Sequence, residues 1–118
     1  NIKIFADVHV KHGSHAIVND RPISEQAGDV EFFDADVTIA TGNRTGDPTS
    51  ISEIKAVKKG TFLPVIVGSG LTEMNAAQIM EAADGAIVGS SLKKQGKWWN
   101  EVEVERVKRL VAEVEKLR

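Results

Sequence analysis

Apolar and polar positions follow two different periods along this chain of 118 residues. Stretches that alternate, or that run continuously through β-branched residues, predict strands, and stretches with an apolar residue every three to four positions predict helices. The predicted strands are residues 2–10, 37–40, 63–67 and 86–88, and the predicted helices lie within 22–33, 50–60, 72–83 and 104–117. The order is therefore a strand followed by a helix, four times over.

Residue types at the ends of these stretches support the helix assignments. Pro22 suits a first helical turn, and Ser50 with Glu53 has the spacing of a capping box. Gly60 stands where a helix C-terminus prefers glycine. Residues 92–99, between the last strand and the last helix, are expected to include a short helical turn.

This alternation predicts an α/β fold with right-handed crossovers and a parallel sheet. The continuous apolar run at 63–67 is typical of a strand that is covered on both faces. A doubly wound sheet and a (β/α)8 barrel both begin in this way. The dinucleotide fingerprint of the doubly wound type is incomplete, because Gly68 and Gly70 are followed by Glu73 where a third glycine is needed. A pair of glycine turns favours the barrel.

Two turns of similar composition follow the third and fourth predicted strands. Glycine lets a ligand approach the bare backbone, and N–H groups at such turns bind anions. In barrel enzymes the loops after the last two strands, with a short extra helix, often hold a phosphate. A plain strand-to-helix connection is the alternative for either turn alone. The predicted phosphate-binding residues are Gly68, Ser69, Gly70, Gly89, Ser90 and Ser91.

The first predicted strand carries charged side chains on one face. Ile4, Ala6, Val8 and Val10 form its apolar face, whereas the other face runs from Phe5 through polar residues toward the carboxyl end. Polar groups on the axis side of a barrel strand are costly to bury without a purpose. The predicted catalytic residues are Asp7 as base or orienting group, His9 as acid or base, and Lys11 as electrophile or phosphate partner. In the alternative, the strand ends before His9 and Lys11 is solvated.

Other polar or aromatic groups give weaker signals. The loop after the second predicted strand suits substrate binding through Thr41, Asn43 and Thr45, with a plain turn as the alternative. His9, His12 and His15 are evenly spaced, but a strand followed by a loop does not by itself bring such residues together, so no metal site is predicted. The adjacent Trp98 and Trp99 are expected to cover the base of the last helix.

Composition excludes several classes of protein. Fifteen Lys and Arg against 17 Asp and Glu give a formal charge of −2, which argues against a nucleic-acid partner. The absence of cysteine excludes disulfides and thiolate sites and fits a reducing, cytoplasmic setting. No apolar run approaches the ~20 residues of a membrane span, although peripheral contact with a membrane stays open.

Four stretches together resemble the C-terminal half of the BtpA/SgcQ family. They are ADVHVKHGSHAI at 6–17, DADVTIATGNRTGDPT at 34–49, PVIVGSGLTEMN at 64–75 and DGAIVGSSLKKQGKWWN at 84–100. The family is similar to ribulose-phosphate-binding TIM barrels. The resemblance implies that residues 1–118 are a half-barrel matching βα units five to eight, a segment of a longer chain, without the first four units.

The resemblance also bears on function. Members in photosynthetic bacteria are associated with accumulation of photosystem I. The residues favour an enzyme that acts by acid/base chemistry on a small phosphorylated metabolite. The alternatives are a non-catalytic assembly factor and a structural half of a larger enzyme. The same turns would suit the phosphate of flavin mononucleotide, a less favoured cofactor. The open edges of the sheet predict association with the missing N-terminal half or with a second copy.

Overall fold

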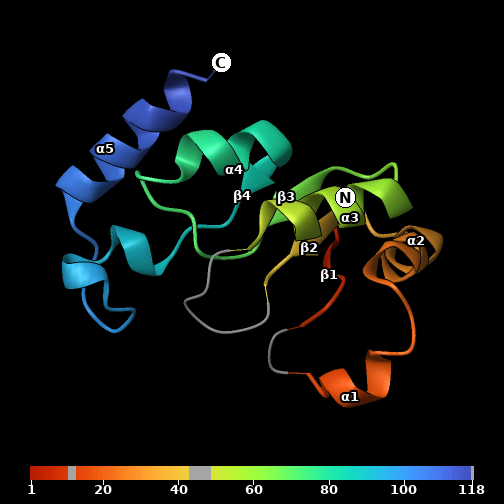
Figure 1. Ribbon diagram of the computed structural model, residues 1–118. Coiled ribbons are helices and arrows are strands. Elements are labelled where there is room, and N and C mark those ends of the chain that lie inside the picture. Colours follow the sequence, from red (N-terminus) through yellow and green to blue (C-terminus); the bar gives the residue numbers. More distant parts are fainter. Residues whose placement is uncertain (11–12, 43–48, 118) are drawn as a thin grey trace.

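The computed structural model describes residues 1–10, 13–42 and 49–117. Eleven short elements succeed one another within these described residues (Figure 1). They are β1 (Phe5–Asp7), α1 (His15–Val18), α2 (Ile23–Phe32), β2 (Val37–Ala40), α3 (Ile51–Gly60), β3 (Val65–Val67), α4 (Ala76–Ala82), β4 (Gly85–Ala86), the 3-10 turns η1 (Ser90–Leu92) and η2 (Lys94–Gly96), and α5 (Val104–Glu115). Among the described residues, no helix has the length and apolar character needed to cross a membrane.

The four strands form one parallel sheet in the order β1-β2-β3-β4. Strand order follows chain order without reversal, as in a barrel and unlike the doubly wound arrangement. Helices α2, α3, α4 and α5 pack on one another in sequence around one side of the sheet (Figure 1). The prediction of four parallel βα units, half of a TIM barrel, is confirmed.

The two faces of the sheet differ in what covers them. Ala40, Val65 and Val67 join the buried core formed with the helices, where Ile54 and Val57 of α3 are fully buried. The alternate strand positions lie on the opposite, inner face. A Cβ on Gly68 would meet the Ile39 side chain there, and a Cβ on Gly85 would meet Ile66. The helices therefore cover one face and leave the inner face to other contacts.

Several predicted boundaries were wrong. The first strand spans only Phe5–Asp7 instead of 2–10, because its one neighbour in the described chain, β2, supplies ladder partners only from Val37 to Ile39. The helix expected from residue 72 begins at Ala76. Trp98 and Trp99 do not cover the base of α5. Both are exposed, and their rings meet edge to face at 5.5 Å.

The capping box at Ser50 forms only in half. Ser50 Oγ accepts a hydrogen bond of 3.1 Å from the N–H of Glu53, as predicted. The Glu53 carboxylate, however, accepts the N–H of Gly42 at 3.2 Å, two residues past the end of β2. The start of α3 is thereby tied to the carboxyl end of the sheet.

Two aspartate carboxylates likewise accept backbone N–H groups, at the amino ends of the strands. The Asp36 carboxylate, before β2, accepts the Ile4 N–H at 2.8 Å and Lys3 Nζ at 2.8 Å. The Asp84 carboxylate, before β4, accepts the Val65 N–H at 2.8 Å and Lys58 Nζ at 3.1 Å. Each carboxylate thus holds the beginning of the preceding strand beside its own.

These bonds predict a loss of stability in acid. The ammonium of Lys3 and the Ile4 N–H hold the pKa of Asp36 below its usual value. Burial raises the pKa of Asp84, but its hydrogen bonds outweigh burial and hold the pKa below the usual value. A carboxylate whose pKa is lower in the folded state than in the unfolded state stabilises the fold at any pH above the unfolded pKa of about 4. This stabilisation is lost as the pH falls through the folded pKa.

The free energy of unfolding is therefore expected to decrease when the pH is lowered below about 4. Asp84→Asn is expected to reduce this fall and to cost about 0.5–1 kcal/mol at pH 7, since the pair with Lys58 is largely solvent-exposed. Urea unfolding at pH 7 and pH 3 measures both effects. A fall of equal size in wild type and variant would contradict the assignment to Asp84.

A fully buried hydroxyl on β2 offers a stabilising substitution. Thr38 Oγ1 is buried among core residues and has no hydrogen-bond partner in the described part of the chain. An unsatisfied buried hydroxyl costs about 1–3 kcal/mol. Thr38→Val keeps the branched shape and removes this oxygen, so it is expected to raise the free energy of unfolding by about 1 kcal/mol. Urea unfolding measures this change. A lower free energy of unfolding for Thr38→Val would show that the Thr38 hydroxyl has a hydrogen-bond partner in solution.

Candidate phosphate groove

Both glycine turns line one groove of about 750 Å³ at the carboxyl end of the sheet. Residues 68–75, which connect β3 to α4, form one wall, and residues 89–92 after β4 form the next. Arg106, Arg109 and Leu110 of α5 line the third side. The structure therefore brings together all six residues that the sequence assigned to phosphate binding.

The turn after β3 is held by its own hydrogen bonds. The Gly68 N–H donates to the Ala40 carbonyl at 2.8 Å as part of the sheet. A Cβ on Gly68 would lie 2.7 Å from Thr41 Cγ2 and 2.8 Å from Ile39 Cγ2, so packing alone requires glycine there. Gly70 has a φ of 82°, a left-handed conformation that favours glycine. Gly68 shapes this turn, and its N–H is already used.

Asn75 fixes the rest of this wall. Its side chain accepts the Thr72 N–H at 2.8 Å and donates to the Gly70 carbonyl at 2.9 Å. One amide thus closes the loop from Gly70 to the start of α4 on both sides. The groove wall is therefore braced before any ligand arrives, which lowers the entropic cost of binding.

The turn after β4 leaves its backbone open. Within the described chain, the N–H groups of Gly89, Ser90 and Ser91 have no acceptor. A Cβ on Gly89 would meet nothing within 4 Å. The Ser91 hydroxyl donates to the Leu71 carbonyl at 2.7 Å and so joins this turn to the other wall. Unclaimed N–H groups at a glycine turn are suited to binding an anion.

Two arginines of α5 complete the groove. Arg106 donates from Nη1 to the Ser91 carbonyl at 3.3 Å and from Nε to Glu103 at 2.7 Å. Arg109 pairs with Glu73 across the groove at 2.8 Å, and this hydrogen bond raises the pKa of Arg109. Neither arginine is predicted as a site residue from the sequence. Arg106 and Arg109 are three positions apart on a helix that also carries the buried Leu110. This spacing is common in amphipathic helices, so it does not single the two arginines out.

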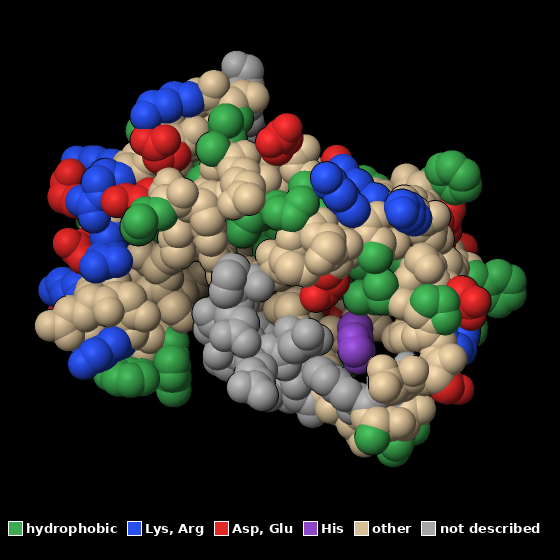
Figure 2. All heavy atoms as spheres, viewed as in Figure 1, with side chains coloured by type: hydrophobic (Ala, Val, Ile, Leu, Met, Phe, Trp, Pro, Cys, Tyr) green, Lys and Arg blue, Asp and Glu red, His purple; other side chains and the backbone are tan. Residues whose placement is uncertain are grey.

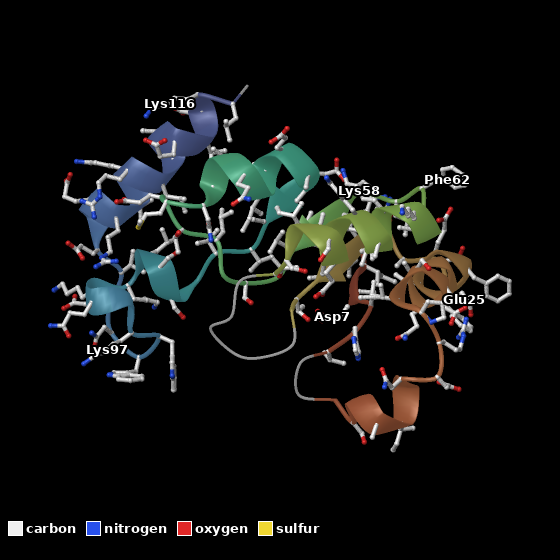
Figure 3. The ribbon with its side chains drawn as sticks, viewed as in Figure 1. Asp7, Glu25, Lys58, Phe62, Lys97 and Lys116 are labelled. Carbon is white, nitrogen blue, oxygen red and sulfur yellow. The ribbon has the colours of Figure 1, made fainter. Side chains whose placement is uncertain are left out.

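Two of the predicted catalytic residues, Asp7 and His9, lie outside this groove. Asp7 ends β1 on the inner-face side of the strand and is exposed (Figure 3). The strand ends before His9, as the alternative reading had it. His9 instead lines a separate cavity of about 300 Å³ together with residues 19–23 and Gln26.

Hydrogen bonds nevertheless link the strand ends in series. Thr41 Oγ1 donates to the His9 carbonyl at 2.8 Å, and Ser69 Oγ donates to the Thr41 carbonyl at a long 3.4 Å. Thr41 is buried, so it acts here as a connection between β1 and the glycine turn. This series brings the ends of the first three strands together at one edge of the sheet.

Several predicted site residues lie outside the described part of the chain. They are Lys11, Asn43 and Thr45. Of the histidines considered for a metal site, His12 is also outside the described part, and for His15 only the backbone is described. Among the described residues no group of three or more His, Asp or Glu side chains is placed to hold a metal ion. The roles of these loop residues stay predictions.

Structural comparison places the sheet among barrels. Phosphoribosyl anthranilate isomerase from Thermus thermophilus superposes with a TM-score of 0.62 at 15% identity, over 98% of this chain and 62% of the isomerase. Tryptophan synthase from Mycobacterium tuberculosis superposes with a TM-score of 0.54 at 21% identity, over 95% of this chain and 39% of the synthase chain. At these identities the likeness shows the fold alone.

Sequence relatives are longer than this chain. An uncharacterized protein of Pyrococcus abyssi is 44% identical over 117 residues, which are 99% of this chain and 44% of that protein. An uncharacterized mitochondrial protein of Caenorhabditis elegans is 38% identical over 118 residues, or 42% of its length. The photosystem I biogenesis protein BtpA of Synechocystis is 36% identical over 99 residues, which are 81% of this chain and 33% of that protein. The chain thus spans less than half the length of these relatives.

The family comparison agrees with the fold and with the motifs at the strand ends. The model of the BtpA family matches residues 1–116, almost the whole chain. The chain belongs to the BtpA family.

Proposed function

We propose that this chain supplies the phosphate-binding half of a barrel that acts on a small phosphorylated metabolite. The observation that carries the proposal is the shared groove: residues 89–91, whose N–H groups have no acceptor in the described chain, line it together with the braced loop 68–75. Backbone N–H groups cannot lose their partial positive charge, so they favour an anion at any physiological pH. Arg106 adds a cation to the same groove.

The position of the groove in the fold supports the same ligand. In barrels the loops after the last two strands frequently hold a phosphate, and β3 and β4 occupy those places if the chain matches units five to eight. The isomerase with the same fold is named for a phosphoribosyl substrate. Its likeness supplies the scaffold, and the groove residues of this chain supply the argument for phosphate.

Proton transfer in the proposed enzyme falls to β1. Asp7 ends the strand on the inner face, and the backbone carbonyl of His9 is linked through Thr41 to the turn at Ser69. In this proposal Asp7 takes a proton from the substrate and the groove holds the phosphate. The side chain of His9 lines the separate cavity, so a proton-transfer role for His9 would require it to turn toward the inner face. Lys11, Asn43 and Thr45 would contact the rest of the substrate.

A complete active site needs four further βα units. We propose that residues 1–118 match the second half of the longer relatives, whose additional length would hold those units. A non-catalytic assembly role is the second candidate, because the Synechocystis relative is named a photosystem I biogenesis protein. Such a protein could keep the phosphate groove without turnover.

Thermal unfolding with matched ligands tests the phosphate site. Ribose 5-phosphate and inorganic phosphate are expected to raise the Tm of the chain, whereas ribose is not. A ligand at about 100 times its Kd adds about 2.7 kcal/mol to stability, well within detection. Flavin mononucleotide belongs in the same series, and a yellow colour retained through gel filtration would favour it as cofactor. If ribose shifts the Tm as much as ribose 5-phosphate does, the phosphate site is refuted.

A further inference from the structure

The candidate groove is larger than one phosphate group requires. Its volume of about 750 Å³ is in the range of sites that enclose a whole small molecule. Beyond the glycine turns it is lined by residues 72–75, which lead into α4, and by α5, and these two helices contact each other. A second hollow of about 300 Å³ shares Glu73, Met74 and Arg109 with it. The groove therefore continues past the phosphate cradle, between α4 and α5.

Arg106 lies in the near part of this extension. Its Nη1 donates to the Ser91 carbonyl at 3.3 Å and its Nε donates to Glu103 at 2.7 Å. The guanidinium thus lies beside the turn at residues 89–91, and its Nη2 has no acceptor in the described chain. A phosphate held by the N–H groups of that turn is therefore also within reach of Arg106.

Arg109 lies almost one helical turn further along α5. Three residues correspond to about 4.5 Å along a helix axis. The Nε of Arg109 donates to Glu73 at 2.8 Å, whereas both of its Nη groups have no acceptor among the described residues. Two phosphates that share a bridging oxygen are separated by a similarly short distance. A second phosphate can therefore reach Arg109 while the first stays beside Arg106.

The ion pair between Arg109 and Glu73 is of a kind that a ligand can open. The two side chains are 51% and 44% exposed, and exposed pairs contribute only about 0–1 kcal/mol. A phosphate can accept two parallel hydrogen bonds from a guanidinium, and such charged bonds are stronger than neutral ones. The half-buried Thr72 lines the same part of the groove, and its hydroxyl has no partner in the described chain. Replacing Glu73 by a second phosphate thus costs little and adds hydrogen bonds.

We propose that the groove binds a diphosphate ester, with its first phosphate at residues 89–91 and Arg106 and its second phosphate at Arg109. This inference rests on the proposed function and narrows its substrate class from phosphate esters in general to diphosphate esters. Glu73 determines the specificity, because its carboxylate occupies Arg109 in the free protein. A monophosphate ester leaves that ion pair closed, whereas a diphosphate ester opens it.

Titration calorimetry of the 118-residue chain with AMP and ADP tests the second phosphate site. The two ligands differ by one phosphate, and divalent cations are left out so that they do not neutralise the ligand. ADP is expected to bind at least about tenfold more tightly than AMP, the equivalent of about 1.4 kcal/mol. Inorganic phosphate and pyrophosphate repeat the comparison without the nucleoside, and the same order is expected.

Arg109→Gln separates the second phosphate site from the first. It is expected to remove most of the preference for ADP and to change AMP binding little, because AMP does not reach Arg109. Lys108→Gln is the matched control, since it removes the same charge from the neighbouring position of α5. Lys108 pairs with Glu105 at 2.9 Å and does not line the groove, so this variant is expected to keep the preference for ADP. Both replaced side chains are exposed, so neither variant disturbs the core.

Glu73→Gln gives an expected change of opposite sign. It frees Arg109 and removes a negative charge from the groove, so ADP is expected to bind about threefold more tightly, while AMP binding changes little. Glu105→Gln is the matched control, because it removes the same charge from the pair with Lys108 outside the groove. A merely structural role of Glu73 would not increase the affinity for ADP.

Each outcome decides the proposal. The preference for ADP, its loss in Arg109→Gln and its increase in Glu73→Gln would support it. Equal affinities for AMP and ADP, or a preference that Arg109→Gln leaves intact, would overturn it. Unchanged or weaker ADP binding by Glu73→Gln would overturn the role of Glu73. If ribose 5-phosphate binds and ADP has no advantage, the diphosphate inference fails alone, whereas if no phosphate ester binds, the proposed function fails with it.

Discussion

Gly60→Ala is expected to destabilise the chain by about 3 kcal/mol, at the upper end of overpacking effects. Gly60 ends α3 against the beginning of α2. A Cβ at this position would lie 1.7 Å from the carbonyl oxygen of Ser24 and 2.5 Å from its carbonyl carbon. These atoms are backbone, so no side chain can turn aside. The two helices must separate, and the buried Ala27 and Val57 lose packing with them.

Urea unfolding with matched glycine variants checks this result. Gly89→Ala adds the same methyl group where it meets nothing within 4 Å, so it is expected to change stability by less than about 0.5 kcal/mol. Gly28→Ala lies in the same helix contact, with its Cβ 3.2 Å from the Gly60 carbonyl, and should fall between the two. If Gly60→Ala and Gly89→Ala unfold at the same urea concentration, α2 and α3 are not in contact in solution.

Gly60 also shows how a correct sequence prediction can rest on an incomplete reason. A glycine after an apolar helical stretch predicts the end of a helix, and α3 does end there. The structure adds a second reason, which is the close approach of Ser24 from a residue far away in sequence. Local pattern predicts boundaries, whereas helix–helix approach depends on the whole fold.

The bounds of some strands could be predicted from the local sequence, whereas those of others could not. Residues 37–40 were predicted without error, because β2 has neighbours on both sides and a buried apolar pattern. The first strand was predicted far too long. Its sequence alternates well beyond Asp7, but ladder hydrogen bonds need a partner, and within the described residues only β2 lies beside it. Strand length at an open edge depends on neighbours that the local sequence does not reveal.

In the candidate site, too, some residues could be identified from the local sequence and others only from the fold. The glycine turns were identifiable because glycine has a local meaning at a strand end. Arg106 and Arg109 reach the groove from α5 and could not be placed there without the fold. The charged pattern of α5 fits a solvated helix face equally well. Asp7 and His9 were assigned to one strand face, and the structure instead separates His9 into its own cavity.

The second large effect is expected at Gly89. Gly89→Asp is expected to weaken binding of ribose 5-phosphate at least tenfold, the equivalent of about 1.4 kcal/mol. The new side chain starts in open space on the groove wall, so the fold accommodates it. Its carboxylate would lie beside the open N–H groups of Ser90 and Ser91, where it competes with the phosphate for them and repels its charge.

Gly89→Asn isolates the charge from the bulk. Asparagine has almost the same size as aspartate and no charge, so it is expected to retain most of the affinity. Titration calorimetry at low and high salt separates charge repulsion from competition for the N–H groups. Repulsion between the carboxylate and the phosphate is screened as the ionic strength rises, whereas competition for the N–H groups is not screened in this way. Equal affinities for Gly89→Asp and Gly89→Asn would place the phosphate away from this turn. The groove formed by the α5 arginines and the glycine backbone would then need a different ligand. Figure 2 shows basic side chains over α5 with acidic ones among them, so the charge of this face does not by itself select a phosphate.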